Sequence, residues 1–278
     1  TQQWRLNGAI TNADAQDRWM LTTPVSYPAD GTAMNTLRKS AANIRLGEYI
    51  ADATAESIAR YGLDTPRLVI RLHQAAGTIG AVGTTGSYAT TDYPESTIAL
   101  VIGEQESDLV DYVLYDGGIY RCSTLLLRGV MNADWQETIT RYPVLTALGN
   151  LASLSRETAD GVHTWVITRT EQVAENNELV TDDEGNQVYD ITLMKNGESA
   201  DYTAFSAAYN QLMMVTMSGR LPDDWTAADA PHTVWTFTDV DGTVHTVALT
   251  RYDAMHDAVA IDGVALFYLI QGGFSLGI

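Results

Sequence analysis

The hexapeptide ADGTAM at residues 29–34 returns as ADYTAF at residues 200–205, and each copy opens a stretch with the apolar spacing of a helix. Further along the chain, DYVLYDG at residues 111–117 returns as DAVAIDG at residues 257–263. The two matched blocks keep the same order in both halves. This order predicts that one structural unit occurs twice in tandem.

We expect the first unit at residues 1–148 and the second at residues 149–278. Asp-Gly between alternating apolar residues is typical of a β-hairpin, so each unit is predicted to contain a mostly antiparallel sheet. One or two helices should pack on each sheet, which gives an α+β fold. If the units are copies, Asp30 and Asp201 should lie at equivalent helix starts.

Two stretches interrupt the repeat. Residues 75–97 are rich in glycine and are predicted to form an inserted hairpin, and a second hairpin is inserted at residues 170–190. Function is often carried by loops on a rigid scaffold, so these stretches are the places where we expect a partner to bind.

The chain is strongly acidic, with 35 Asp and Glu against 16 Lys and Arg and a net charge of −19. Such a surface repels polyphosphate and contains no run of Lys or Arg, so we expect no binding to nucleic acid. Contact with a membrane is expected only through an N-terminal anchor. A basic protein partner fits the charge better.

The chain has one cysteine, Cys122, which lies among apolar residues. An internal disulfide is therefore impossible, and we expect Cys122 to be a small core residue. The sequence GFSLG at residues 273–277 fits a G-x-S-x-G nucleophile elbow, but only Ile278 follows it. Because that elbow needs a following helix, an acid and a histidine, we expect no nucleophile at Ser275.

The five histidines have none of the spacings of a helical or strand chelator, and the nearest approach to a cluster is His256 and Asp257 beside Asp253. Asp257 matches Asp111 of the first unit, which indicates a structural carboxylate. We assign no catalytic, cofactor-binding or metal-binding residue and expect no cofactor.

Two acidic stretches resemble fragments of calcium loops, at residues 182–185 and 239–242. Neither has the bidentate Glu beyond its glycine, and both stand where a turn is needed, so turn formation is the favoured interpretation. Among the tryptophans, Trp135 and Trp225 are expected to be exposed. Trp19, Trp165 and Trp235 are expected in the core.

Several of these segments resemble a bacterial family known as domain of unknown function 4340. The segments are Trp19-Met20-Leu21, Ala29-Asp30, the turn YGLDTP at residues 61–66 and the strand pair at residues 113–120. The resemblance covers residues 17–131 and is weaker in the second unit. It implies an envelope protein, often lipid-anchored and encoded near ABC-type export systems, and it brings no catalytic residue.

We therefore expect a non-catalytic binding or scaffolding protein of a bacterial envelope assembly, with a protein partner associated with an ABC-type transporter. The expected location is extracytoplasmic, with an anchor in a segment outside this chain. Two alternatives remain open, a hydrolase of surface polymers and a calcium- or carbohydrate-binding adhesive module.

Overall fold

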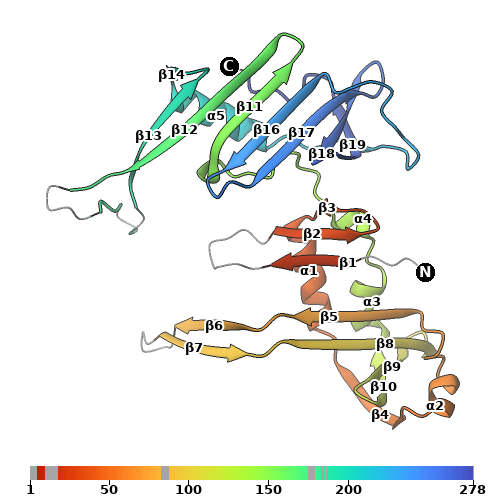
Figure 1. Ribbon diagram of the computed structural model, residues 1–278. Coiled ribbons are helices and arrows are strands. Elements are labelled where there is room, and N and C mark those ends of the chain that lie inside the picture. The colour runs from red at the N-terminus through yellow and green to blue at the C-terminus, as the bar shows by residue number, and fades with distance from the viewer. Residues whose placement is uncertain are drawn as a thin grey trace. The chain divides into compact units, whose positions relative to one another are not determined.

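The computed structural model describes residues 5–9, 18–82, 88–174, 179–182, 185 and 187–277 (Figure 1). Within these residues every strand pairing is antiparallel, and the helices are few and short, so the fold is broadly α+β. The chain divides into two compact units. Unit 1 combines residues 1–30 with residues 139–278, and unit 2 is formed by residues 31–138.

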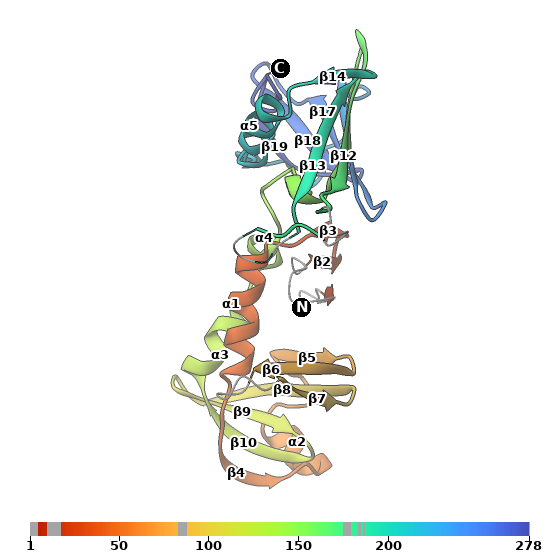
Figure 2. The ribbon, with the colours of Figure 1, turned by 90° about the vertical axis from the view of Figure 1, so that its left-hand side faces the viewer.

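Unit 2 is built on a five-stranded sheet of order β4-β10-β9-β8-β5, with a separate two-stranded ribbon, β6-β7. Its elements are α1 Gly31–Ala42, β4 Leu46–Asp52, α2 Ala55–Arg60, β5 Leu68–Gln74, β6 Gly77–Val82, β7 Tyr88–Tyr93, β8 Ser96–Ser107, β9 Val110–Tyr115, β10 Gly118–Ser123, α3 Thr124–Met131 and α4 Trp135–Thr138. Figure 2 shows α1 and α3 side by side.

The core of unit 2 lies where α3 covers one face of the sheet. Apolar residues of β5, β8, β9 and β10 alternate toward that face and meet Leu127 of α3. The buried members are Ile70, Leu100, Ile102, Val113, Cys122 and Leu127.

Local sequence explains the ends of several elements in unit 2. Thr54 and Ser57 form a capping box at the start of α2, since each side chain accepts a hydrogen bond from the other residue's backbone N–H. The β9–β10 hairpin turns through Asp116 and Gly117, whose φ angles of 45° and 76° suit a two-residue turn with left-handed geometry.

Unit 1 holds a nine-stranded sheet of order β14-β13-β12-β11-β16-β17-β18-β19-β15 and a three-stranded sheet, β1-β2-β3. Its elements are β1 Arg5–Ala9, β2 Arg18–Thr23, β3 Tyr27–Pro28, the 3₁₀ helix Leu148–Asn150, β11 Leu151–Thr158, β12 Gly161–Glu171, β13 Tyr189–Lys195, β14 Glu198–Ala200, α5 Tyr202–Met213, β15 Gly219–Arg220, β16 Thr233–Asp239, β17 Val244–Arg251, β18 His256–Ile261 and β19 Val264–Ile270.

An aromatic core joins α5 to the nine-stranded sheet. Trp165 and Trp235 stack with ring centroids 6.4 Å apart, and Phe205 of α5 lies 6.4 Å from Trp165. The Asp201 carboxylate caps α5 by accepting hydrogen bonds from the N–H groups of Thr203 and Ala204.

The two compact units differ from the division into residues 1–148 and 149–278 that the sequence led us to expect. The reason is that the chain leaves unit 1 after Asp30 and returns to it at Ile139, where Ala29 and Ile139 form a β-bridge. The Thr140 N–H also donates to the Pro28 carbonyl at 3.0 Å. Such long-range pairing leaves no mark in local sequence.

Both stretches expected as insertions are hairpins as far as they are described. Residues 77–93 contain the β6–β7 ribbon, and residues 83–87 lie outside the described part. The second insertion extends the β12–β13 hairpin, and residues 175–178, 183, 184 and 186 within it lie outside the described part.

Candidate functional site

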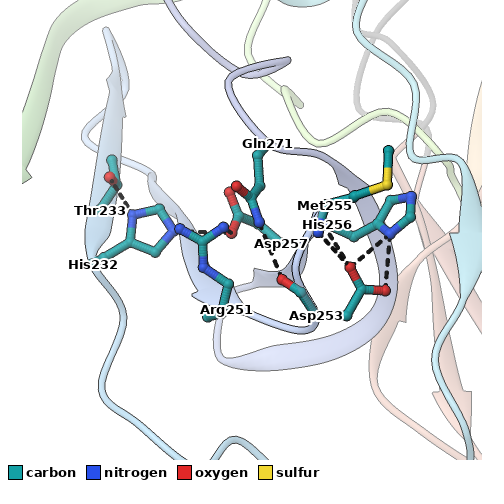
Figure 3. Close-up of polar contacts among 8 residues, drawn as sticks. All are labelled: His232, Thr233, Arg251, Asp253, Met255, His256, Asp257 and Gln271. Atoms are coloured by element: carbon teal, nitrogen blue, oxygen red, sulfur yellow. Dashed lines mark hydrogen bonds and ion pairs between the residues drawn. The ribbon is translucent and has the colours of Figure 1, made fainter.

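The most organised polar group in unit 1 is the buried carboxylate of Asp257, at one end of the nine-stranded sheet (Figure 3). His232 precedes β16 and places Nε2 3.2 Å from Asp257 Oδ1. Arg251 ends β17 and places a guanidinium nitrogen 3.6 Å from the same oxygen. A buried carboxylate stays charged only when cations or hydrogen bonds compensate it, and Arg251 supplies such a cation.

A second acid–histidine pair lies in the turn that leads into β18. Asp253 accepts hydrogen bonds from the Met255 N–H at 2.7 Å, the His256 N–H at 2.9 Å and His256 Nδ1 at 2.9 Å. These contacts, the Met255 N–H first among them, lower the pKa of Asp253 below its ordinary value. The Gln271 side chain donates to the Asp253 carbonyl at 3.1 Å and ties the end of β19 to this turn.

Unit 2 contains a buried carboxylate of the same kind. Asp111 of β9 is fully buried, and the Arg67 guanidinium pairs with it just before β5 begins. Arg67 Nε also donates to the Gly103 carbonyl at 2.6 Å, which holds the guanidinium in place. Thus in each unit the residue directly after a proline, Arg67 after Pro66 or His232 after Pro231, contacts a buried Asp.

The chemistry open to the unit 1 site can be judged from its neighbours. His232 Nδ1 lies 3.0 Å from Thr233 Oγ1, so carboxylate, imidazole and hydroxyl stand in sequence as they do in a hydrolytic triad. However, Arg251 faces the same carboxylate oxygen, and unit 2 has an arginine where unit 1 has the imidazole. The feature that both units share is a cation against a buried carboxylate, which fits a structural ion pair.

The sequence grouped His256 and Asp257 beside Asp253 without assigning contacts among them. His256 contacts Asp253, whereas Asp257 is paired with His232 and Arg251, two residues that the sequence analysis did not select. A usable signal was present, since a basic residue follows both Pro66 and Pro231.

Cys122 is buried in the core of unit 2, which confirms the expectation of a small core residue. Its Sγ donates to the Arg45 carbonyl at 3.4 Å, and burial raises the pKa of the thiol. Ser275 lies in the non-helical segment after β19, between the buried side chains of Phe274 and Leu276. Its hydroxyl accepts a hydrogen bond from the Gly277 N–H at 3.4 Å.

The two calcium-like stretches adopt turns in their described residues. The Gly242 N–H donates to the Asp239 carbonyl at 2.9 Å, and the Thr243 N–H donates to the Asp241 carboxylate at 2.9 Å. In the other stretch the Gly185 N–H donates to the Asp182 carbonyl, and Asp183 and Glu184 lie outside the described part. Over the described ranges of the chain, no three His, Cys, Asp or Glu residues are grouped so that they could hold a metal.

The tryptophans follow the expectation in part. Trp165 and Trp235 are buried, as predicted, whereas Trp19 is half-buried. Trp135 and Trp225 are half-buried too, so the expectation that they are exposed was wrong. Trp225 packs edge-on against Tyr252, with ring centroids 6.2 Å apart, because the loop before β16 folds back on the sheet.

A second feature of unit 1 is an arm, which we define as residues 169–191, the distal part of the β12–β13 hairpin. In Figure 1 its described parts in β12 and β13 extend beyond the neighbouring strand β11. Along β12 and β13 the buried Ile167 and Leu193 face the core, and four apolar residues farther out along the arm are exposed. They are Val173, Leu179, Tyr189 and Ile191.

Fold and site together define a mostly antiparallel α+β protein in which each compact unit pairs a buried carboxylate with a cation. The family model of a domain of unknown function, DUF4340, matches residues 19–233, and the chain belongs to this family. No curated protein and no solved structure matches the chain. Among the described helices, none has both the length and the apolar character that crossing a membrane requires.

Proposed function

We propose that this protein is a non-catalytic binding or scaffolding protein of a bacterial envelope assembly, and that the assembly serves an ABC-type export system. The envelope location and the link to export rest on what the family resemblance implies. The binding role rests on the arm of unit 1, which presents an apolar strip that the rest of the unit leaves exposed.

The proposal rests on the exposure of the apolar strip and on its position at the end of the sheet. Val173 and Leu179 form a β-bridge and are 55% and 54% exposed. Nearer to the core, Ile191 and Tyr189 of β13 continue the face that buries Leu193, opposite Arg169 and Glu171 of β12. An exposed apolar strip on a core-type face marks a surface that another protein covers.

The charge of the arm indicates the chemistry of its partner. Glu171 and Asp190 flank the apolar strip, Asp182 lies beyond it, and no Lys or Arg occurs between Arg169 and Lys195. Complementary charge steers association and selects the partner. We therefore assign the arm to a partner surface that combines basic side chains with an apolar patch.

The scaffold itself is proposed to consist of two copies of one module. In unit 2 the strand after α1 lies at the edge of the sheet and is followed by β10, β9, β8 and β5. In unit 1 the strand after α5 also lies at an edge and is followed by β19, β18, β17 and β16. This shared order supports the duplication, as do the left-handed Asp-Gly turns and the buried Asp111 and Asp257.

The register of the arm allows a clean deletion. Glu171 and Tyr189 are the last paired residues of β12 and β13, so Asn-Gly in place of residues 172–188 closes the hairpin with a two-residue turn. The matched control replaces residues 75–95 by Asn-Gly between Gln74 and Ser96, the last pair of β5 and β8.

Pull-down from envelope extract at low salt tests the proposal with these two proteins and the unaltered chain. We expect the arm deletion to lose a partner that the control deletion keeps, and we expect added salt to weaken capture because it screens exposed charges. If both deletions fold and keep every partner, or if the unaltered chain captures only a small ligand, the scaffold proposal fails.

A further inference from the structure

The nine-stranded sheet of unit 1 has one face against α5 and a second face that we call the outer face (Figure 2). Side chains alternate between the two faces along each strand, so the strand register identifies the outer residues. On β12, Trp165 and Ile167 are buried on the α5 side, whereas Thr164 and Val166 lie on the outer face. The outer residues form three rows that cross the sheet, and each of them is half-buried or exposed.

The first row is apolar at both ends. Its residues are successive cross-strand partners from β13 to β17, namely Met194, Val166, Ser153, Thr238 and Val244. Met194, Val166 and Val244 are 36%, 42% and 52% exposed. Apolar side chains held on a flat sheet favour contact with another surface over contact with water.

The second row consists of hydroxyl side chains. It runs from β12 to β17 through Thr164, Ser155, Thr236 and Thr246, and all four are half-buried. A hydroxyl group both donates and accepts hydrogen bonds, so this row can satisfy the same row of a second copy. A row of carboxylates or of cations could not do so.

The third row contains the one ionisable residue of the three rows. Its residues are Val162, Glu157, Val234 and Ala248, again as partners from β12 to β17. Val162 is 57% exposed, and Glu157 lies one position from the end of β11. The carboxylate therefore belongs to the rim of the outer face, where protein interfaces are polar.

The face of the unit 2 sheet that lies opposite α3 is built differently. Arg121 of β10 points away from the side of the buried Cys122 and forms ion pairs with Glu48 of β4 and Glu106 of β8. Such charges are typical of a sheet face in contact with water. The outer face of unit 1 has the alternation of a solvated sheet without these charges, although acidic residues outnumber basic ones by 35 to 16 in the full sequence.

The flat part of the outer face is large enough for a specific contact. It spans the five strands from β13 to β17 in sheet order and the three rows, so it measures about 24 Å by 20 Å, or roughly 500 Å². Two such faces bury roughly 1,000 Å² in total, which is the lower limit for a specific interface. At β18 and β19 the stacked rings of Tyr252 and Tyr268 form the border of this flat area.

We propose that the outer face binds the outer face of a second copy of this chain, so that two nine-stranded sheets pack face to face in a symmetric dimer. Aligned sheets pack about 10 Å apart, and short side chains such as Val, Thr, Ser and Ala allow that distance. A net charge of −19 makes two copies repel each other, so contact is least costly where charge is absent. The proposal goes beyond the partner-binding role of the arm and does not depend on it.

A two-fold axis along the hydroxyl row gives the arrangement that this face favours. Such an axis reverses the strand direction between the copies, so the row with Glu157 on one copy faces the row with Val166 on the other. The two Glu157 carboxylates then lie on opposite sides of the axis and avoid each other. On the axis itself, each hydroxyl of the second row faces its own counterpart.

Sedimentation velocity of the full chain over a range of protein concentrations tests the proposal. We expect a monomer–dimer equilibrium that shifts toward the dimer as salt is added, because salt screens the repulsion between two acidic chains. Capture of a basic partner by the arm should respond to salt in the opposite way. The salt response therefore separates the two contacts.

A lysine on the axis should break the dimer. Thr236→Lys brings two ammonium groups face to face and should raise the dimer dissociation constant about a hundredfold, because like charges meet where water is excluded. The matched control is Met214→Lys, which makes the same change in net charge at an exposed position that follows α5. It should leave the dissociation constant unchanged. If Thr236→Lys fails to fold, Thr164→Lys on the same row gives the same comparison.

Removal of the single carboxylate should have the opposite effect. Glu157→Gln should lower the dissociation constant about tenfold, because the facing row contains no cation that compensates Glu157 when water is excluded. Glu198→Gln is the control, since Glu198 is exposed and pairs with Lys195, whose register places both on the α5 side of the sheet. This control should dimerise as the unaltered chain does.

A chain that remains monomeric at every salt concentration would overturn the proposal. Equal effects of Thr236→Lys and Met214→Lys, or a dimer that weakens as salt is added, would also overturn it. Binding of the monomer to an insoluble glycan polymer, abolished by Thr236→Lys, would assign the outer face to a glycan in place of a second copy.

Discussion

At the scale of single residues, the two buried carboxylates explain why a basic residue stands just before β5 and just before β16. Asp111 and Asp257 are placed on the core face of their sheets, where an uncompensated charge is costly. Arg67 and His232 reach them from the residue after a proline. These contacts connect strands that are not neighbours in either sheet.

Arg67→Ala should destabilise unit 2, because it leaves Asp111 buried without its cation. We expect a loss of about 2 kcal/mol in the free energy of unfolding, less than for a fully buried pair since the Arg67 side chain is 34% exposed. Urea unfolding measures this loss. Arg71→Ala, at an exposed position of β5, should change stability little, and equal effects of the two substitutions would rule out the structural role of the pair.

Asp253 should contribute to the acid sensitivity of unit 1. Its pKa in the folded protein lies below the ordinary value of 3.8, so its carboxylate stabilises the fold above that pH. The contribution is lost as pH falls through the lowered pKa. The stability difference between the protein and Asp253→Asn should therefore be constant above about pH 5 and shrink below pH 4. If the stability difference grows on acidification, folding does not lower the pKa of Asp253.

At the scale of elements, much of the local structure could be predicted. The helices expected after Asp30 and Asp201 are α1 and α5, and the Asp-Gly hairpin at residues 116–117 is present. These elements depend on caps, periodicity and turn residues that lie within a few positions of one another. Local sequence is therefore sufficient for them.

Two glycine substitutions should change stability in opposite directions, because the backbone conformation differs between the two positions. Gly117 has a φ of 76°, so Gly117→Ala should cost about 1 kcal/mol from backbone strain alone. Gly31 begins α1 with open space around it and no left-handed backbone, so Gly31→Ala should stabilise the protein by roughly 0.5 kcal/mol. Chemical denaturation of both variants checks the signs. A loss at Gly31 as large as that at Gly117 would refute the assignment.

The candidate site was harder to predict than the elements. The sequence marked Asp257 as structural but not its partners, since His232 and Arg251 come from two other strand ends. The apolar strip of the arm was also missed, because its residues alternate like those of a buried strand. These residues are exposed because α5 does not cover this part of the hairpin. How far α5 reaches depends on three-dimensional packing.

At the scale of the whole molecule, local sequence also failed to predict how the chain divides into compact units. The repeat suggested two consecutive units, whereas contacts join residues 1–30 to residues 139–278. The β-bridge between Ala29 and Ile139 closes unit 1 around the point where unit 2 is inserted. Pairing between positions so far apart is set by the folded structure and not by local pattern.

The most direct test of this account is to separate the units. One protein consists of residues 31–138, and the other replaces residues 31–138 by a short Gly-Ser linker, which the contact between Pro28 and Thr140 can accommodate. We predict a single cooperative urea transition for each, with Arg67→Ala affecting only the first protein and Asp257→Ala only the second. An unfolded 31–138 fragment, with stable folding of fragments 1–148 and 149–278 instead, would contradict the account.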